Sequence, residues 1–314
     1  MTIKDYIRRD LLNFKPYHAP LKPYDIKVDA NENPFSHHPS VIEKTKIWLD
    51  NKDHLTRYPD TDSMELRTKL ADFYQVSPQN IICGVGSDQL IEYVTKCFVE
   101  PGDNVLVPDP SFSMYGIANA LNHGITINYE LSDTFEYDEN MIVRLCLEHN
   151  PKLLFICTPN NPTGSIISNE QVLSILKKVS CPVVLDEAYD EFVEESMVSY
   201  IKEYPNLLIL RTFSKAFGCA GLRVGYGIGS EDMIEALNIC KSPYNLPSIS
   251  SAIAGFVLEE EDYYMANVSN MNINRELLYE ELTQLEWLKA VYPSKANFIL
   301  IKTSDEDTNQ IASY

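Results

Sequence analysis

The stretch LLILRTFSKAF, at residues 207–217, decides the fold, because four large aliphatic residues are followed at once by a run that contains Thr212, Ser214 and Lys215. A short, fully apolar run with polar residues at its end indicates a strand that is buried on both faces of a sheet. In open parallel sheets, ligands sit at the carboxyl ends of the strands. The polar half of this stretch is therefore a candidate site, and the apolar half is a candidate central strand.

Similar apolar runs recur on both sides of this stretch. They lie at residues 81–83, 105–107, 153–157, 183–185 and 224–228. Helical patterns separate them, most clearly after Asp88, where one face carries Leu90, Ile91, Val94 and Phe98. This alternation predicts an α/β fold with a mostly parallel central sheet that is flanked by helices.

The domain organisation follows from the same patterns, since no repeat or Gly/Ser linker interrupts the chain. Residues 1–40 are Pro-rich at several points and predict an N-terminal arm, and residues 41–247 predict a large domain. Residues 248–314 predict a smaller α/β domain, with one long helical segment near 251–285 and a late strand at 296–301. The acidic run at residues 259–262 predicts a solvated helix end without a function.

Composition excludes several classes of function. The formal net charge of −19 argues against a nucleic-acid-binding protein. No apolar run reaches the ~20 residues of a membrane span, and the first residues lack the pattern of a signal peptide, which predicts a cytoplasmic protein. The seven cysteines are odd in number and lack C-x-x-C spacing, so we expect reduced and mostly buried thiols.

Polar segments follow three further strands. Gly84-Val85-Gly86-Ser87-Asp88 follows the run at 81–83 and opens a helix, which favours a phosphate cradle because glycines let backbone amides approach an anion. Taken by itself, however, the segment is more typical of a tight structural turn, since neither the P-loop nor the dinucleotide pattern is complete. The turn at residues 158–164 contains Asn161 between prolines and could direct its side chain inward, but by itself it is more typical of a structural turn.

The third polar segment begins with Asp186, which ends the apolar run at 183–185. A carboxylate in that position must be paired or hydrogen-bonded. Because no histidine lies near the acidic run that follows, we expect no metal site there. The fourth polar segment is the one that follows the run at 207–210. It places hydroxyl residues beside Lys215, and Arg223 comes shortly afterwards, which favours a Schiff-base lysine surrounded by phosphate-binding groups.

Six motifs, in this order along the chain, resemble those of the fold-type-I aminotransferases that use pyridoxal 5′-phosphate (PLP), and within them the histidinol-phosphate aminotransferase subgroup. The motifs are DANENP (29–34), RYPD (57–60), PNNPTG (159–164), DEAY (186–189), RTFSKAF (211–217) and AGLRVG (220–225). The resemblance covers residues 15–301. It implies a PLP-dependent transferase fold of type I and transamination between histidinol phosphate and 2-oxoglutarate in histidine biosynthesis.

The resemblance also implies residue roles. Lys215 would bind PLP covalently and move the proton between the substrate's Cα and the C4′ carbon of PLP, and Asp186 would pair with the pyridine nitrogen. Asn161 and Tyr189 would hydrogen-bond the phenolic oxygen, and Phe112 would stack on the ring. The phosphate would be held by Ser87, Asp88, Thr212, Ser214 and Arg223. Tyr58 would reach the phosphate of a neighbouring subunit, which implies a homodimer, while Tyr17 and Asn33 would approach the substrate.

The chain departs from the subgroup near its C-terminus, where relatives continue past the strand at 296–301 and supply substrate-binding arginines. The last arginine here is Arg275, so we expect an incomplete small domain without the usual substrate clamp. Two alternatives therefore stay open: a PLP-dependent decarboxylase or lyase of a phosphorylated amino acid, and a truncated PLP-binding protein with little activity.

Overall fold

The computed structural model describes residues 2–12, 26–193 and 195–304. The chain divides into two compact units, Met1–Ala30 and Asn31–Tyr314. The first contains the short 3-10 helices η1 (Ile3–Tyr6) and η2 (Arg9–Leu11) and an ion pair between Lys27 and Asp29. The second contains all the elements described below, and its division at residue 247 into a large and a small domain stays a prediction.

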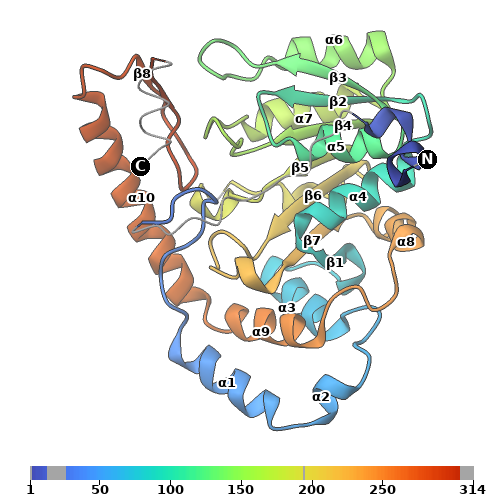
Figure 1. Ribbon diagram of the computed structural model, residues 1–314, viewed down its shortest axis with the longest axis vertical. Coiled ribbons are helices and arrows are strands. Elements are labelled where there is room, and N and C mark those ends of the chain that lie inside the picture. Colours follow the sequence, from blue (N-terminus) through green and yellow to red (C-terminus); the bar gives the residue numbers. More distant parts are fainter. Residues whose placement is uncertain (1, 13–25, 194, 305–314) are drawn as a thin grey trace. The chain divides into compact units, whose positions relative to one another are not determined.

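A seven-stranded sheet with the order β1-β7-β6-β5-β4-β2-β3 forms the centre of the second unit (Figure 1). Its strands are β1 (Ile81–Val85), β2 (Asn104–Asp109), β3 (Ile125–Glu130), β4 (Leu153–Cys157), β5 (Val183–Asp186), β6 (Leu207–Thr212) and β7 (Val224–Gly229). The six strands expected from the apolar runs are all present. The sheet is mostly parallel, as predicted.

The strand directions bring the polar segments together. The pairs among β2, β3, β4, β5 and β6 are all parallel, whereas β7 is antiparallel to both β6 and β1. It follows that β1 runs in the same direction as β6. The carboxyl ends of six strands and the start of β7 therefore lie along one edge of the sheet, which we call the strand-end edge.

Helices cover both faces of the sheet, because the strands are apolar on both sides. Helices α4, α5 and α8 contribute side chains to the core on one face, and α3, α6, α7, α9 and α10 contribute to the core on the other. The helices are α1 (Pro39–Leu49), α2 (Asp53–Thr56), α3 (Met64–Tyr74), α4 (Gly86–Phe98), α5 (Met114–Leu121), α6 (Glu139–His149), α7 (Asn169–Lys178), α8 (Glu231–Cys240), α9 (Ser248–Leu258) and α10 (Glu261–Thr283). The core of the fold is therefore two apolar layers separated by the sheet.

The last part of the chain differs from the prediction. Of the expected strand at 296–301, only Ile301 lies in a ladder, as the first residue of β9 (Ile301–Lys302), which pairs with β8 (Ala290–Val291). At the start of this segment, the Ala296 carbonyl accepts a hydrogen bond from the Arg275 side chain at 3.1 Å instead of one from a neighbouring strand. The prediction of a full strand was therefore wrong.

The expected long helix near 251–285 is two helices, and the acidic run lies at their junction. Glu259 forms ion pairs with Lys44 of α1 and Lys69 of α3, both at 2.7 Å. This run is therefore a set of helix-to-helix ion pairs as well as a helix end. The seven cysteines are free, and five are buried, as expected. In the described ranges, no helix is both long and apolar enough to cross a membrane.

Candidate active site

Asp186, the last residue of β5, lies at the strand-end edge with 3% of its surface exposed. One carboxylate oxygen accepts a hydrogen bond from the Tyr115 hydroxyl at 2.7 Å, and the other accepts one from the Ala188 amide at 3.1 Å. Burial raises the pKa of Asp186 to about 6, and these two hydrogen bonds act in the opposite direction. Since both donors are neutral, a cationic group beside this carboxylate would stabilise its charge strongly.

Lys215 supplies positive charge close to Asp186. It lies three residues after the end of β6, and its charge also lowers the pKa of Asp186. The Lys215 Nζ lies 5.5 Å from the centre of the Tyr189 ring. The structure thus brings together the three residues predicted to be catalytic: Lys215, Asp186 and Tyr189.

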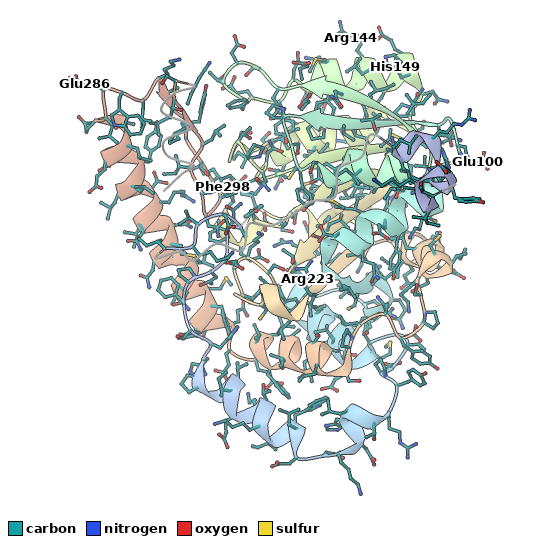
Figure 2. The ribbon with its side chains drawn as sticks, viewed as in Figure 1. Glu100, Arg144, His149, Arg223, Glu286 and Phe298 are labelled. Atoms are coloured by element: carbon teal, nitrogen blue, oxygen red, sulfur yellow. The ribbon has the colours of Figure 1, made fainter. Side chains whose placement is uncertain are left out.

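Tyr189 is buried, with 3% of its surface exposed. Burial raises its pKa, while a hydrogen bond from Asn31 to its hydroxyl, at 3.1 Å, acts to lower it. Phe298 contacts the Tyr189 ring edge-on, with the ring centres 5.2 Å apart. Figure 2 labels Phe298 between α10 and the central sheet. Tyr189 is therefore held from two sides and stays protonated at neutral pH.

The predicted phosphate-binding residues gather where β6, β7 and α4 meet. The Thr212 hydroxyl donates to the Ser214 hydroxyl at 3.0 Å, and the Arg223 Nη2 lies 3.0 Å from the Asp88 carboxylate. Arg223, labelled in Figure 2, precedes β7 directly, and its carbonyl accepts a hydrogen bond from the Gly86 amide at 3.0 Å. Hydroxyls, a guanidinium and a helix start thus lie within one small region.

Two glycines allow this close approach. Gly86 has φ +74°, and a Cβ at Gly225 would lie 2.3 Å from the Ser87 amide nitrogen, so a larger residue at Gly225 would collide with the backbone. Ser87 belongs to the first turn of α4, whose leading amides have no acceptor within the helix. These amides and the helix dipole favour an anion here.

Phe112 and Asn161 lie on two turns that are tied together by a residue which the sequence did not single out. Asn160 is fully buried and donates to the Pro110 carbonyl at 2.9 Å. It also accepts a hydrogen bond from the Ser111 hydroxyl at 2.6 Å. These two hydrogen bonds of Asn160 therefore fix the turn that carries Phe112 relative to the turn that carries Asn161.

The remaining predicted residues have different surroundings. Tyr58 is 81% exposed and stacks on Tyr244, with ring centres 4.5 Å apart, so it lies outside the cluster just described. Asn33 donates to the carbonyl of Ala216, the neighbour of Lys215, at 2.8 Å. Tyr17 lies outside the described residues. The substrate-binding roles of Asn33 and Tyr17 stay predictions.

The acids that follow Asp186 surround an arginine on the other face of the sheet. Arg211 lies 2.9 Å from Glu187, 2.6 Å from Asp190 and 3.0 Å from Glu191, and all four side chains are buried. Burial raises the pKa of Glu187 to about 7 and that of Glu191 to about 6, against the attraction of Arg211. These ion pairs tie the loop of Asp186 and Tyr189 to the strand that precedes Lys215. In the described part of the chain, no group of three or more His, Cys, Asp or Glu side chains is arranged to hold a metal ion.

Sequence reasoning missed Tyr115, Asn31 and Arg211 as parts of this arrangement. Tyr115 contacts Asp186 across 71 positions, and Asn31 contacts Tyr189 across 158. Local patterns carry no information on such distant partners. The only hint was position, because Tyr115 lies in the first turn of α5, shortly after Phe112, and Arg211 is a charged residue inside a buried strand.

This arrangement fits PLP. Asp186 is a buried carboxylate that a protonated pyridine nitrogen would neutralise, and the charge of Lys215 already acts on it. The hydroxyls, Arg223 and the start of α4 offer a phosphate site beside them. The geometry thus defines a PLP-dependent transferase of fold type I.

Comparison with known proteins identifies the family. The family model described as aminotransferase class I and II matches residues 24–313. The chain therefore belongs to the class I and II aminotransferases.

Its relatives narrow the assignment. A histidinol-phosphate aminotransferase of Ruminiclostridium cellulolyticum is 42% identical over 96% of this chain and 85% of its own length. One of Thermoanaerobacter pseudethanolicus is 40% identical over 97% and 86%. Within its class, the chain is thus a member of the histidinol-phosphate aminotransferases.

Solved structures agree with this assignment. The crystal structure of histidinol-phosphate aminotransferase from Sinorhizobium meliloti in complex with pyridoxal-5′-phosphate has a TM-score of 0.83 at 26% identity, covering 90% of this chain and 77% of that one. L-threonine-O-3-phosphate decarboxylase from Porphyromonas gingivalis has a TM-score of 0.72 at 23% identity, covering 84% and 78%. The second match shows a shared fold alone.

Proposed function

We propose that this aminotransferase moves an amino group between histidinol phosphate and 2-oxoglutarate, with PLP held on Lys215. The observation that carries the proposal is that Lys215 lies at the strand-end edge with its Nζ 5.5 Å from the centre of the Tyr189 ring, close enough to Asp186 for its charge to lower the pKa of that carboxyl. The assignment of the substrates rests on the relatives, which are histidinol-phosphate aminotransferases at about 40% identity over most of this chain.

The residues would act as follows. PLP, when bound, supplies an aromatic ring that accepts the electron pair left on the substrate's Cα. Lys215 would carry the cofactor and, once displaced by the substrate amine, would take the proton from Cα and return it to the cofactor's C4′ carbon. Asp186 would keep the ring nitrogen protonated, and Tyr189 and Asn161 would hydrogen-bond the phenolic oxygen.

Other residues would hold the cofactor in place. Phe112 would cover one face of its ring and exclude water. Its phosphate would be bound by the amides of Ser87 and Asp88, by Thr212 and Ser214, and by Arg223. Asn33 and Tyr17 would approach the substrate. The seven free thiols also fit a reducing compartment, which supports the cytoplasm as the location.

A single half-reaction tests the proposed chemistry. Addition of histidinol phosphate to the PLP-loaded protein is expected to abolish the visible absorbance of the lysine-bound cofactor and to release one equivalent of the ketone. Addition of 2-oxoglutarate should then restore that absorbance. Carbon dioxide release from a phosphorylated amino acid, without turnover of 2-oxoglutarate, would instead establish a decarboxylase. Unchanged absorbance with bound cofactor would leave a PLP-binding protein of little activity.

We further propose a homodimer in which each chain donates Tyr58 to its partner's phosphate site. Tyr58 is exposed, and so are apolar side chains on the neighbouring helices α1 and α2, including Ile42, Ile47, Leu49 and Leu55. Exposed apolar residues gathered in one region are typical of an interface between subunits. This arrangement would complete each site with a residue that its own chain keeps outside.

Mixing two inactive variants tests this sharing. If Tyr58 acts in the partner, a dimer of one Tyr58→Ala chain and one Lys215→Ala chain contains one intact site. Equal amounts that exchange subunits should then recover about a quarter of the wild-type activity. If Tyr58 acts within its own chain, the mixture would stay as inactive as its parts, and a monomer in sedimentation would exclude the dimer.

A further inference from the structure

Asn31 contacts the candidate site from a segment far away in the sequence. Its side-chain nitrogen, Nδ2, lies 3.1 Å from the hydroxyl oxygen of Tyr189. Two residues later, Asn33 donates to the carbonyl of Ala216 at 2.8 Å. The segment at residues 31–33 thus touches both Tyr189 and the neighbour of Lys215, and the proposed mechanism gives Asn31 no role.

The chemistry of the two groups fixes the direction of this hydrogen bond. An amide nitrogen of asparagine only donates, whereas a phenol oxygen both accepts and carries one proton of its own. At 3.1 Å, Tyr189 therefore accepts from Asn31. Its own proton must point away from Asn31, toward another acceptor.

Neighbouring contacts hold Asn31 in this orientation. Asn31 has φ +52°, a left-handed conformation that asparagine tolerates better than most residues. Its carbonyl accepts a hydrogen bond from the Asn297 side chain at 3.0 Å. The next residue, Phe298, packs edge-on against the ring of Tyr189. One short segment near the end of the described chain therefore supports both members of the pair.

We propose that Asn31 is a positioning residue that directs the hydroxyl proton of Tyr189 toward the phenolic oxygen of PLP. This inference rests on the proposed function, because it requires that oxygen within reach of Tyr189. A donor at the phenolic oxygen withdraws negative charge from it, so the nitrogen that links Lys215 to the cofactor binds its proton less tightly. Asn31 would thus set the pH at which this nitrogen titrates without touching the cofactor.

The variant Asn31→Asp tests the direction of the hydrogen bond. A carboxylate has nearly the same shape and also tolerates the left-handed backbone, but it only accepts, so it would draw the Tyr189 proton toward itself. The pH midpoint of the visible absorbance of the lysine-bound cofactor is expected to rise by roughly one unit. The variant Asn31→Gly keeps the backbone and removes the amide, and it should give a smaller rise.

Two further variants separate this effect from a structural one. Asn206→Asp changes an asparagine that donates to the Cys181 carbonyl at the opposite end of the sheet, and it should leave the midpoint unchanged. In a Tyr189→Phe background, Asn31→Asp should cause a clearly smaller shift, because the proton that it redirects is gone and only the effect of its added charge remains. Circular dichroism checks that each variant is folded.

The outcomes are distinct. A midpoint that is the same in Asn31→Asp and wild type, or a shift of the same size with and without the Tyr189 hydroxyl, overturns this inference alone. If the wild-type protein bound no PLP at Lys215, that result would contradict both the proposed function and this inference.

Discussion

Replacement of Lys215 by alanine is expected to lower the rate of transamination by roughly 10⁴-fold. The variant loses both the covalent attachment of the cofactor and the amine that moves the proton, while the buried Asp186 and the phosphate-binding residues remain. PLP should therefore still bind, without covalent linkage, and a small primary amine added to the solution should restore part of the rate. The measurement is kcat with saturating histidinol phosphate and 2-oxoglutarate, with and without that amine.

The matched control is Lys177→Ala, which removes an exposed lysine on α7. Its kcat should equal that of the wild type. If Lys215→Ala kept more than about one tenth of the wild-type kcat, the role of Lys215 in moving the proton would be wrong, because general acid–base groups contribute at least roughly 10²-fold.

Replacement of Asp186 by asparagine is expected to lower kcat by roughly 10²- to 10³-fold, as for the loss of one preorganised electrostatic group in other enzymes. Asparagine keeps the shape and the hydrogen bond from Tyr115 but removes the negative charge that would keep the pyridine nitrogen protonated. The control is Asp109→Asn, since Asp109 also ends a strand of this sheet but is exposed. Equal kcat values for the Asp186 and Asp109 variants would contradict the assignment.

The pKa of Asp186 adds a pH dependence to this prediction. Because burial raises that pKa to about 6, the carboxyl group becomes protonated and neutral as the pH falls through 6. The affinity of the apoprotein for PLP should therefore fall below about pH 6. Tyr115→Phe removes a hydrogen bond that stabilises the charged form and should move this fall to higher pH. Equilibrium titration of the apoprotein with PLP at several pH values measures both effects.

The sequence predicted the central part of the fold well because the strands are buried on both faces. The run at 153–157 coincides with β4, and the run at 207–210 lies within β6. β3 was missed because it lies at the edge of the sheet, where only Tyr129 of its six residues is buried. Its sequence, ITINYE, shows no continuous apolar run. Burial on both faces is thus what made the other strands readable.

The site could be predicted as far as residues follow strands directly. Asp186, Lys215 and Arg223 all lie next to strand ends, so a parallel sheet brings them together once its strand order is set. Tyr115 and Asn31 act through partners that are distant in sequence, and only tertiary packing brings those contacts about. The strand expected at 296–301 is shorter for a related reason, because the Ala296 carbonyl is bound by the side chain of Arg275, which is distant in the sequence, and the ladder begins only at Ile301.

Borohydride reduction followed by peptide mass spectrometry tests the central claim most directly. Reduction of the purified protein with PLP should fix the cofactor irreversibly to one peptide. The account predicts that this peptide contains Lys215 and that the added mass is on that lysine. Attachment at another lysine, or no attachment in a protein that holds PLP, would contradict it.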